Sequence, residues 1–332
     1  MRPLQVGVIG CGSISTVAHI PLLTKIKGVR VLAIADPDPH RLDVAHRIAP
    51  GASRHQSIDD LLNESNVDAL IIASPTALHA ANAITAFQSS VHVYLEKPVA
   101  ASMDDALAVV DAWHKSGRVG AIGHNFRFNP VFARLASMIR DGSIHNIRHF
   151  ESEFIVPHPA ESSWRRSAEG GGALLDLATH HIDLVRFLSN SEVTSVTGKI
   201  ESRVTYEDHA VIDLVLASGC SARVTVAFGG AFIDRIAVDA ESGRIEADRS
   251  QSHLLPFPSR LLHIAKKLRS PMHEPSFERS LNLFVDSARS GIDFHPNLDD
   301  GCASLEIALA ARNSAASGLP ISMGSCKLGQ NE

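Results

Sequence analysis

Short apolar runs and amphipathic helical stretches alternate along the first third of the chain. The runs LQVGVI (4–9), VRVLAIAD (29–36), VDALIIAS (67–74), VHVYLEK (91–97) and VGAIGHN (119–125) have the length and apolar character of buried strands. Helical patterns stand between them: one from the first glycine loop through about residue 27, then RLDVAHRIA, ALHAANAITAFQSS and MDDALAVVDAWHKSG. Strands that alternate with helices predict a parallel sheet with right-handed crossovers.

The regular alternation of short apolar runs with helical stretches ends near residue 125. The helix NPVFARLASMIRDG, the strand HNIRHFESEFIVP, the loop HPAESSWRRSAEGGG and the helix ALLDLATHHIDLVRFLS are followed by several long alternating runs between 192 and 249. Their hairpin-like punctuation predicts an antiparallel sheet with one wetter face. FERSLNLFVDSARSG and DDGCASLEIALAARNSAASG close the chain as helices. The pattern therefore predicts an α/β protein of two domains, 1–124 and 125–332.

Composition narrows the class of protein. The 332 residues are 45% apolar and 20% charged, the balance of a soluble globular protein, and the formal net charge of −5 leaves no basic field for nucleic acid. No run of eighteen apolar residues or secretory signal stands out, so we expect no membrane contact and a cytoplasmic location. The basic amphipathic stretch 260–271 is interpreted as a solvated face rather than a membrane or partner contact.

Cysteine and tyrosine usage excludes two further chemistries. The four cysteines, at 11, 220, 302 and 326, lie far apart, which disfavours a disulfide framework and a cysteine-ligated zinc. The residues four places after Tyr94 and Tyr206 are Pro98 and Ala210, so the Tyr-x-x-x-Lys pair of short-chain dehydrogenases is absent.

A glycine loop follows the first strand. Gly10 permits a tight turn, Gly12 lets backbone N–H groups approach a pyrophosphate, and Ser15 stands where a third glycine is usual. Asp36 ends the second strand, where a carboxylate accepts hydrogen bonds from an adenosine ribose and repels a 2′-phosphate. A structural turn is the alternative, but the strand, helix and acidic residue together favour a bound NAD. Arg41 is close enough in sequence to keep NADP possible.

Two further motifs carry candidate chemistry. Glu96-Lys97-Pro98 ends a predicted parallel strand, the edge where open α/β sheets bind ligands, although a lysine there is more often a surface charge. Gly170-Gly171-Gly172 leads into a helix on which Asp176, His180 and Asp183 share one face at i, i+4 and i+7. A carboxylate beside an imidazole suits proton transfer from an alcohol. A polar helix face or histidines packed in a domain interface would explain the same spacing.

The chain resembles a known family over nearly its whole length. The matching segments are VGVIGCGSIS, VLAIADPD, Ser74-Pro75-Thr76 with His79, VYLEKP, GHNFRFNP, GGGALLDLATHHIDL and the last helix with SAASGLPISM. They resemble the GFO/IDH/MocA oxidoreductases, which include glucose–fructose oxidoreductase and inositol 2-dehydrogenase. The resemblance implies a Rossmann NAD(P)-binding domain (1–124) and a substrate-binding and oligomerisation α/β domain (125–332) with a large, mainly antiparallel open sheet.

The resemblance also implies an activity, hydride transfer between nicotinamide and a hydroxyl-bearing carbon of a sugar, cyclitol or related polyol. Lys97, Asp176 and His180 match catalytic positions, with His180 as the general acid/base. The residues that match cofactor contacts are Gly10, Gly12, Ser13, Ile14, Asp36, Ser74, Pro75, Thr76, His79, Glu96 and Lys97. Those that match substrate contacts are Asn125, Arg127, Trp164, Arg165, Asp176 and His180. No metal is required, because the lysine and histidine supply the polarisation.

Three departures from the family pattern remove no group that the chemistry needs: Ser15, Ala178, which stands where glycine is frequent, and Gln88-Ser89-Ser90 in place of Ala-Gly. Two other functions stay open, a redox-neutral NAD-dependent glycosidase and a non-catalytic nucleotide-binding regulator. The intact set of Lys97, Asp176 and His180 argues against the regulator. We also expect a homodimer or homotetramer, since the wide second sheet would leave an apolar face uncovered.

Overall fold

The computed structural model describes residues 2–161, 163–249 and 274–324. The described residues form two compact units, one within 1–128 and 254–298 and the other within 129–253 and 299–332. The first break thus falls after Phe128, close to the predicted boundary, and residues 274–298 join the first unit rather than the second. The basic stretch 260–271 and Cys326 lie outside the described residues.

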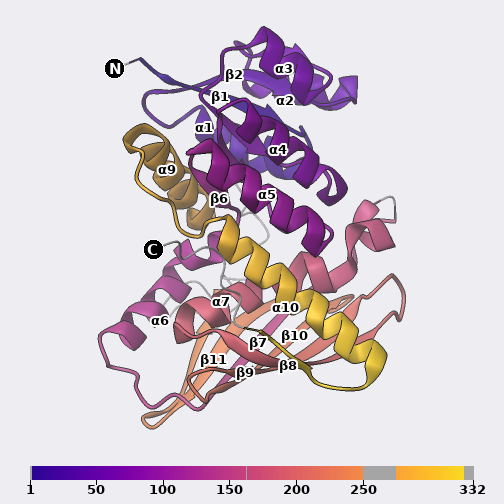
Figure 1. The fold of residues 1–332 in the computed structure, drawn as a ribbon, viewed down its shortest axis with the longest axis vertical. Coiled ribbons are helices and arrows are strands. Elements are labelled where there is room, and N and C mark those ends of the chain that lie inside the picture. Colours follow the sequence, from indigo (N-terminus) through magenta and orange to yellow (C-terminus); the bar gives the residue numbers. More distant parts are fainter. Residues whose placement is uncertain (1, 162, 250–273, 325–332) are drawn as a thin grey trace, which may run out of the picture. The chain divides into compact units, whose positions relative to one another are not determined.

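The first unit contains a six-stranded parallel sheet (Figure 1). Its strands are β1 (Leu4–Ile9), β2 (Val29–Ala35), β3 (Ser53–His55), β4 (Ala69–Ile72), β5 (His92–Leu95) and β6 (Gly120–Ile122). The order β3-β2-β1-β4-β5-β6 is that of the doubly wound dinucleotide-binding fold, and the chain reverses direction across the sheet between β1 and β4. The predicted parallel sheet is confirmed.

Helices cover both faces of this sheet. They are α1 (Ile20–Leu23), α2 (Pro39–Ile48), α3 (Ile58–Glu64), α4 (His79–Gln88), α5 (Met103–Ser116) and α9 (Pro275–Ser290). Asp38, Ser57 and Ser102 cap α2, α3 and α5 by accepting hydrogen bonds from backbone N–H groups of the first turn. The hydrophobic pattern did not predict β3 and α3, because three and seven residues are too short to show a period.

Helix α9 supplies part of the first unit's core. Its residues Leu281, Phe284 and Val285 are fully buried, and the Phe284 ring lies edge-on to Tyr94 of β5 with centroids 5.6 Å apart. The Tyr94 hydroxyl is 3.1 Å from Ser280 Oγ. The spacing of these apolar residues predicted a helix, but their partners lie on a strand about 190 residues earlier, so the pattern assigned the helix to the wrong unit.

The second unit contains a seven-stranded sheet in the order β12-β11-β7-β10-β9-β8-β13. The strands are β7 (His149–Val156), β8 (Val193–Glu201), β9 (His209–Leu216), β10 (Ser221–Phe228), β11 (Ile233–Ala240), β12 (Gly243–Asp248) and β13 (Ile321–Ser322). Only β7 and β10 pair in parallel, so the predicted, mainly antiparallel sheet is confirmed.

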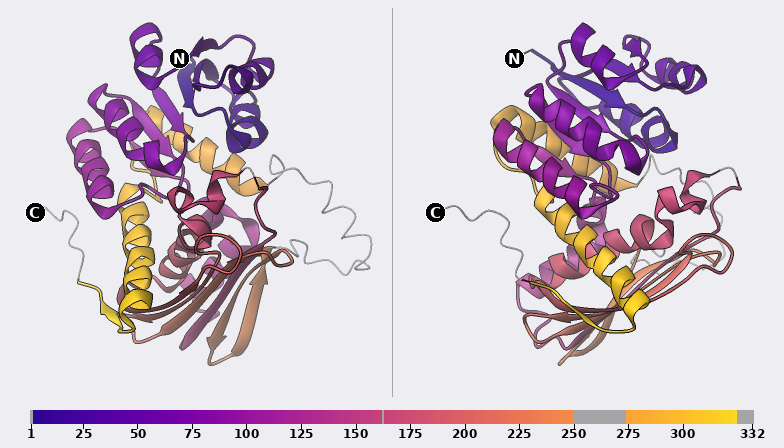
Figure 2. Two further views of the ribbon diagram at one scale, coloured as in Figure 1. Left: turned by 90° about the vertical axis from the view of Figure 1, so that its right-hand side faces the viewer. Right: turned by 45° about the vertical axis from the view of Figure 1, so that its right-hand side comes forward.

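The helices α6 (Pro130–Arg140), α7 (Thr179–Ser189) and α10 (Leu298–Ser317) gather on one face of the second sheet (Figures 1 and 2). No described helix covers the opposite face (Figure 2). That face differs from the apolar surface expected from the sequence, because cross-strand ion pairs alternate with apolar side chains on it. These pairs include Arg223–Asp213 at 2.7 Å, Arg235–Glu246 at 3.4 Å and Arg244–Asp239 at 3.1 Å.

Candidate functional site

The glycine loop lies at the carboxyl end of β1. Gly10 has a φ of +86°, and a Cβ there would lie 2.6 Å from the Ala73 carbonyl oxygen, so only glycine fits. A Cβ at Gly12 would meet no atom within 4 Å, which leaves open space in front of that residue. Ser13 and Ile14 then lead into a helical segment. An open loop that begins a helix fits a pyrophosphate.

Ser15, the first departure from the family pattern, is fully buried at the start of a π-helical turn, Ser15–His19. Its hydroxyl donates a hydrogen bond of 2.5 Å to the Gly10 carbonyl oxygen. The serine therefore ties the first turn of the helix to the glycine loop, in a place where a third glycine would offer no side chain.

Asp36 follows β2 beside the glycine loop. Its carboxylate is buried and accepts hydrogen bonds from the backbone N–H groups of Cys11 (2.8 Å) and Asp38 (2.9 Å). Burial, and then the charge of Asp36, raise the pKa of the Cys11 thiol to about 12, so this cysteine stays an unreactive thiol. Arg41 Nε lies 3.5 Å from Asp38 Oδ2, so the Asp38 carboxylate partly compensates the positive charge of Arg41.

The other predicted cofactor residues of the first unit follow β4 and β5, at the same edge of the parallel sheet. They are Ser74, Pro75, Thr76, His79, Glu96 and Lys97. Thr76 is buried at the start of a 3₁₀ turn, and Ser74 Oγ accepts a hydrogen bond of 3.0 Å from Asn82. Both ring nitrogens of His79 face carbonyl oxygens, and Glu96 pairs with His19. The side chains of His79 and Glu96 therefore make polar contacts within the protein itself.

Asn125 and Arg127 share a 3₁₀ turn, Asn125–Phe128, that follows β6. Asn125 is buried, and its Nδ2 donates a hydrogen bond of 3.1 Å to Ser276 Oγ near the start of α9. Arg127 is half-buried. The sequence predicted that both residues bind substrate. In the structure, the side-chain amide of Asn125 connects this turn to α9.

The triple glycine of the second unit allows the chain to approach its own backbone closely. Gly171 and Gly172 have φ values of +71° and +61°, and a Cβ at Gly172 would lie 2.3 Å from the Tyr206 carbonyl oxygen. The neighbouring Glu207 accepts two hydrogen bonds of 2.7 Å from Arg312. The sequence indicated a close approach at these glycines without identifying what approaches, and the structure identifies it as the 206–207 segment.

Asp176 and His180 lie on consecutive helical segments, a π-helical turn (Leu174–Ala178) and the first turn of α7. Asp176 forms an ion pair with Arg165, whose guanidinium lies 5.5 Å from the centre of the Phe228 ring. His180 is largely buried, and its ring lies edge-on to Phe154 with centroids 6.4 Å apart. The structure therefore brings together Asp176 and Arg165, which the sequence predicted separately.

Two other residues of this region were singled out from the sequence. Trp164 precedes Arg165 on a 3₁₀ turn, Trp164–Arg166, and is 44% exposed. Its indole ring is therefore accessible to a ligand. Ala178 is fully buried, so its methyl group is accommodated where a glycine is frequent in the family.

A buried polar chain beneath α7 was not predicted. His181 is fully buried between Ser152 of β7, which contacts its Nδ1, and Asp234 of β11, 3.5 Å from its Nε2. Arg249 donates a 2.6 Å hydrogen bond to Asp234. Burial raises the pKa of Asp234, but the charges and hydrogen bonds of Arg249 and His181 outweigh it, so the pKa lies below its ordinary value. The available signal was Asp234 itself, a charged residue at an inward position of the strand IDRIAVDA.

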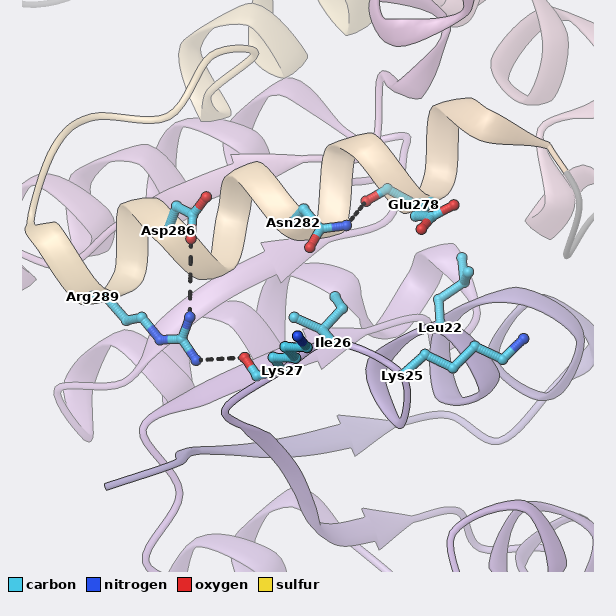
Figure 3. A pocket seen from close by; sticks show the side chains of 8 residues that line it. All are labelled: Leu22, Lys25, Ile26, Lys27, Glu278, Asn282, Asp286 and Arg289. Carbon is cyan, nitrogen blue, oxygen red and sulfur yellow. Dashed lines mark hydrogen bonds and ion pairs between the residues drawn. The ribbon is translucent and has the colours of Figure 1, made fainter. Parts of the chain in front are cut away.

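One hollow of the described residues lies away from these side chains. A groove of about 360 Å³ runs between the segment after α1 and the outer side of α9 (Figure 3). Arg289 at one end donates a 3.2 Å hydrogen bond to the Lys27 carbonyl oxygen. Lys27 precedes β2, so the groove lies at the amino edge of the sheet, opposite the glycine loop. It contains none of the predicted site residues.

In the part of the chain that the structure describes, no group of three or more His, Cys, Asp or Glu side chains is placed to hold a metal ion. None of the helices described is long and apolar enough to cross a membrane.

The chain matches two family models. Residues 4–124 match one described as an oxidoreductase family with an NAD-binding Rossmann fold, and residues 132–246 match the GFO/IDH/MocA C-terminal domain. Together these ranges take in more than half of the chain.

Individual proteins show the same likeness along the whole chain. It is 27% identical over 342 residues to the uncharacterized oxidoreductase YrbE of Bacillus subtilis (strain 168), with 97% of each chain covered. It is 25% identical to the myo-inositol 2-dehydrogenase of Thermotoga maritima, with 94% of this chain and 96% of the relative covered. The WlbA dehydrogenase from Bordetella pertussis, solved with NADH and UDP-GlcNAcA, has the same fold, with a TM-score of 0.85 at 24% identity and 97% and 98% coverage.

Proposed function

This chain belongs to the GFO/IDH/MocA oxidoreductase family, and we propose that it transfers a hydride between NAD and a hydroxyl-bearing carbon of a sugar, cyclitol or related polyol. The observation that carries the proposal is the carboxyl edge of the first sheet, where the open loop at Gly12, the carboxylate of Asp36 and Lys97 follow β1, β2 and β5. The relative named myo-inositol 2-dehydrogenase supports the substrate class.

The Gly10–Ile14 loop fits the pyrophosphate of NAD, and Asp36 fits the adenosine ribose. Backbone N–H groups at the start of a helix favour a bound anion. The Asp36 carboxylate is already oriented by two backbone N–H groups, and its negative charge repels a 2′-phosphate. The pairing of Arg41 with Asp38 leaves less positive charge for that phosphate, so we expect NAD to be preferred to NADP. When bound, NAD supplies the hydride acceptor or donor.

We propose that His180 takes the hydroxyl proton as hydride leaves the substrate carbon, and returns it in the reverse direction. Lys97 holds a positive charge for the oxygen that becomes a carbonyl. Asp176 accepts hydrogen bonds from substrate hydroxyls, while Arg165 compensates its charge. Under this mechanism no metal is required.

The remaining predicted contacts divide into two sets. Ser74, Pro75 and Thr76 are proposed to line the nicotinamide side, because they follow β4 at the edge that carries the glycine loop. Arg127 and Trp164 are proposed to contact substrate, and the 44% exposure of Trp164 is consistent with a ring that covers a sugar face. Asn125 is proposed to act by orienting the turn that carries Arg127.

The test is turnover of a panel of sugars and inositols with NAD⁺ or NADP⁺, followed at the nicotinamide absorbance. Lys97→Met and His180→Ala should each lower kcat by at least about 100-fold, the usual contribution of a positioned acid or base. NADH binding, measured by fluorescence titration, should persist in His180→Ala. Matched controls are Lys115→Met and His145→Ala, whose side chains are exposed.

The alternative functions give different outcomes in the same assays. Protein that purifies with one nucleotide per chain and converts a glycoside without net absorbance change is the redox-neutral enzyme. Protein that binds NADH but turns over no member of the panel is the regulator. Wild-type activity in both variants would contradict the proposed catalytic roles.

We further propose a nucleotide-binding role for the first unit, a substrate-binding and oligomerisation role for the second, and a homodimer or homotetramer formed through the uncovered face of the second sheet. The mixture of ion pairs and apolar side chains on that face suits a surface that is exposed before association. A cytoplasmic location is also proposed, because the four cysteines lie far apart in the sequence, which disfavours the disulfide framework of a secreted protein.

A further inference from the structure

We propose that two buried histidines, His19 and His79, are positioning residues for Lys97, and that they hold the Glu96–Pro98 segment from its two sides. The inference rests on the proposed role of Lys97 in the reaction. His19 belongs to the helix that begins in the glycine loop, and His79 begins α4 after the Ser74–Thr76 segment. Neither histidine would need to touch the substrate.

His19 holds the side chain of Glu96. The histidine is fully buried, and its Nε2 lies 2.8 Å from Glu96 Oε1. Its other ring nitrogen is buried with no hydrogen-bond partner among the described residues. The ring is fixed by edge-on contacts with Tyr94 and Phe277, both at 5.8 Å between centroids. A ring so enclosed has one polar contact to make, and that contact is Glu96.

Glu96 has little freedom to choose another partner. Its backbone N–H donates a 2.8 Å hydrogen bond to the Ile72 carbonyl oxygen, which continues the sheet, and its side chain lies against Gly123, where a Cβ would be 2.9 Å from Oε2. Burial raises the pKa of Glu96, but the hydrogen bond from His19 and the nearby charges outweigh it, and the pKa lies below its ordinary value. Glu96 is therefore a carboxylate that His19 orients.

His79 holds the other side of the segment. Its Nδ1 lies 2.7 Å from the Pro98 carbonyl oxygen and its Nε2 lies 2.8 Å from the Ser74 carbonyl oxygen. The ring thus bridges the segments that follow β4 and β5. Burial lowers the pKa of His79, so the neutral ring has one N–H for the two carbonyls at neutral pH. The ring donates to one of the two carbonyl oxygens at a time and lies within 2.8 Å of both, so His79 acts through backbone position rather than by contacting the cofactor.

These contacts place Lys97 between two fixed neighbours. Its backbone is anchored through the Glu96 carboxylate on one side and the Pro98 carbonyl on the other, and its own side chain is half-buried. Because His19 lies seven residues after Gly12 on the helix that begins at the glycine loop, the same helix would support both the nucleotide and Lys97. Substitution of His19 should therefore affect both.

The test uses four variants. His19→Gln keeps an N–H donor for Glu96, whereas His19→Leu removes it. His79→Asn keeps a donor near Pro98, whereas His79→Phe keeps only the ring shape. His114→Gln, at an exposed position on α5, is the control. For each variant we would measure kcat and KM for the polyol, NADH binding, and the rate at which the Lys97 amine is labelled between pH 7 and pH 10, with Lys115 of the same chain as the internal reference.

His19→Leu and His79→Phe should lower kcat at least 10-fold with a smaller change in KM, and should shift the labelling profile of Lys97 relative to Lys115. His19→Gln and His79→Asn should keep most of the wild-type kcat and a Lys97 labelling profile close to that of the wild type. His19→Leu should also weaken NADH binding. If the Leu and Phe variants do not fold, the Gln and Asn variants provide the test. A positioning role requires that the labelling profile of Lys97 in these two variants stays close to that of the wild type.

Labelling does not depend on turnover, so it separates this inference from the proposed function. A wild type that oxidises no polyol, with a Lys97 profile that responds to His19 and His79, would contradict the proposed function alone. Folded Leu and Phe variants with unchanged kcat and an unchanged Lys97 profile would overturn the positioning role alone. The positioning role would also be overturned if the labelling profile of Lys97 changed as much in the Gln and Asn variants as in the Leu and Phe variants.

Discussion

At the scale of single residues, the nucleotide loop shows how one substitution is accommodated by a specific contact. Ser15 occupies a position where glycine is usual because of close helix–strand packing. The structure gives its hydroxyl a buried acceptor, the Gly10 carbonyl oxygen. The residue is therefore compatible with a tight loop and adds a hydrogen bond to it.

Ser15→Ala should weaken NADH binding about 5-fold, because a neutral hydrogen bond contributes about 1 kcal/mol and this one fixes the first turn of the loop. Fluorescence titration of NADH measures the change. Thr24→Ala is a matched control, since the Thr24 hydroxyl also bonds a backbone carbonyl but does so at an exposed helix end. Equal NADH affinity in Ser15→Ala and wild type would show that the bond has no role in binding.

At the scale of elements, α9 shows that a helix can belong to a unit far from it in sequence. The helix buries Phe284 against Tyr94 of β5, and Arg289 near its end donates a 2.6 Å hydrogen bond to the Gly28 carbonyl oxygen, just before β2. Figure 3 shows Arg289 reaching across to the segment before β2. Contacts in the middle and near the carboxyl end of the helix therefore attach it to the parallel sheet.

Phe284→Ala should destabilise the first unit by about 3–5 kcal/mol, the usual loss for a buried phenylalanine. Hydrogen exchange of peptides from β5 and β6 should speed up, while peptides from β9 and β10 keep their protection. Leu283→Ala is the control on the same helix, since Leu283 is 40% exposed. Faster exchange confined to the second sheet would contradict the assignment of α9 to the first unit.

The junction of β5 and β6 carries a pH-sensitive contact. His92 Nδ1 accepts a 3.0 Å hydrogen bond from the Val119 N–H, which requires an unprotonated nitrogen. Burial, and then the charge of Arg118, lower the pKa of His92 below its ordinary value of 6.5. The unfolded chain therefore takes up this proton first, and the contribution to stability is lost as pH falls below about 6.5.

His92→Asn should make the free energy of unfolding less dependent on pH between 7.5 and 5.5, because Asn Oδ1 can accept the same hydrogen bond without titrating. Urea unfolding at several pH values in that range measures the slope. His79 and His209, whose pKa values are also lowered by burial, should keep part of the dependence. Equal slopes in wild type and variant would show that His92 does not contribute.

At the scale of the whole molecule, the uncovered face of the second sheet is the surface with the clearest consequence. Thr225 lies on β10, the central strand, and pairs with Val211 of β9 and Glu153 of β7. Its neighbours on this face are therefore one apolar and one acidic side chain. A surface of this mixed character can be solvated alone or buried between copies of the chain.

Thr225→Arg should dissociate the proposed oligomer, because a long cation at the centre of the face cannot be buried against its own copy. Light scattering after size exclusion should give the mass of a single chain, 35.6 kDa, in place of a multiple. The carboxylate of Glu153, which pairs with position 225 from the neighbouring strand, should compensate the charge of the introduced arginine, so the sheet should still fold. Ser89→Arg, at an exposed position of the first unit, should leave the mass unchanged. An unchanged mass for Thr225→Arg would place the interface elsewhere.

The sequence was sufficient where local pattern decides structure. Apolar runs and helical periods predicted the parallel sheet, an antiparallel second sheet and most helices, because burial on one or both faces imposes those periods. The order of strands and loops also placed Gly12, Asp36 and Lys97 at one edge, since the carboxyl ends of parallel strands share an edge. Motif spacing indicated the family, which the matches to both halves of the chain confirm.

Only the tertiary structure decided which side chains meet. The pairing of Asp176 with Arg165, the chain from Ser152 to Arg249 and the return of α9 to the first unit join residues whose separation in sequence carries no period. The same holds for His19 and Glu96, 77 residues apart, because a buried histidine in an apolar stretch looks like any other core position until its partner is known. Local sequence determined the elements, and the packing of distant elements determined the contacts of the proposed site.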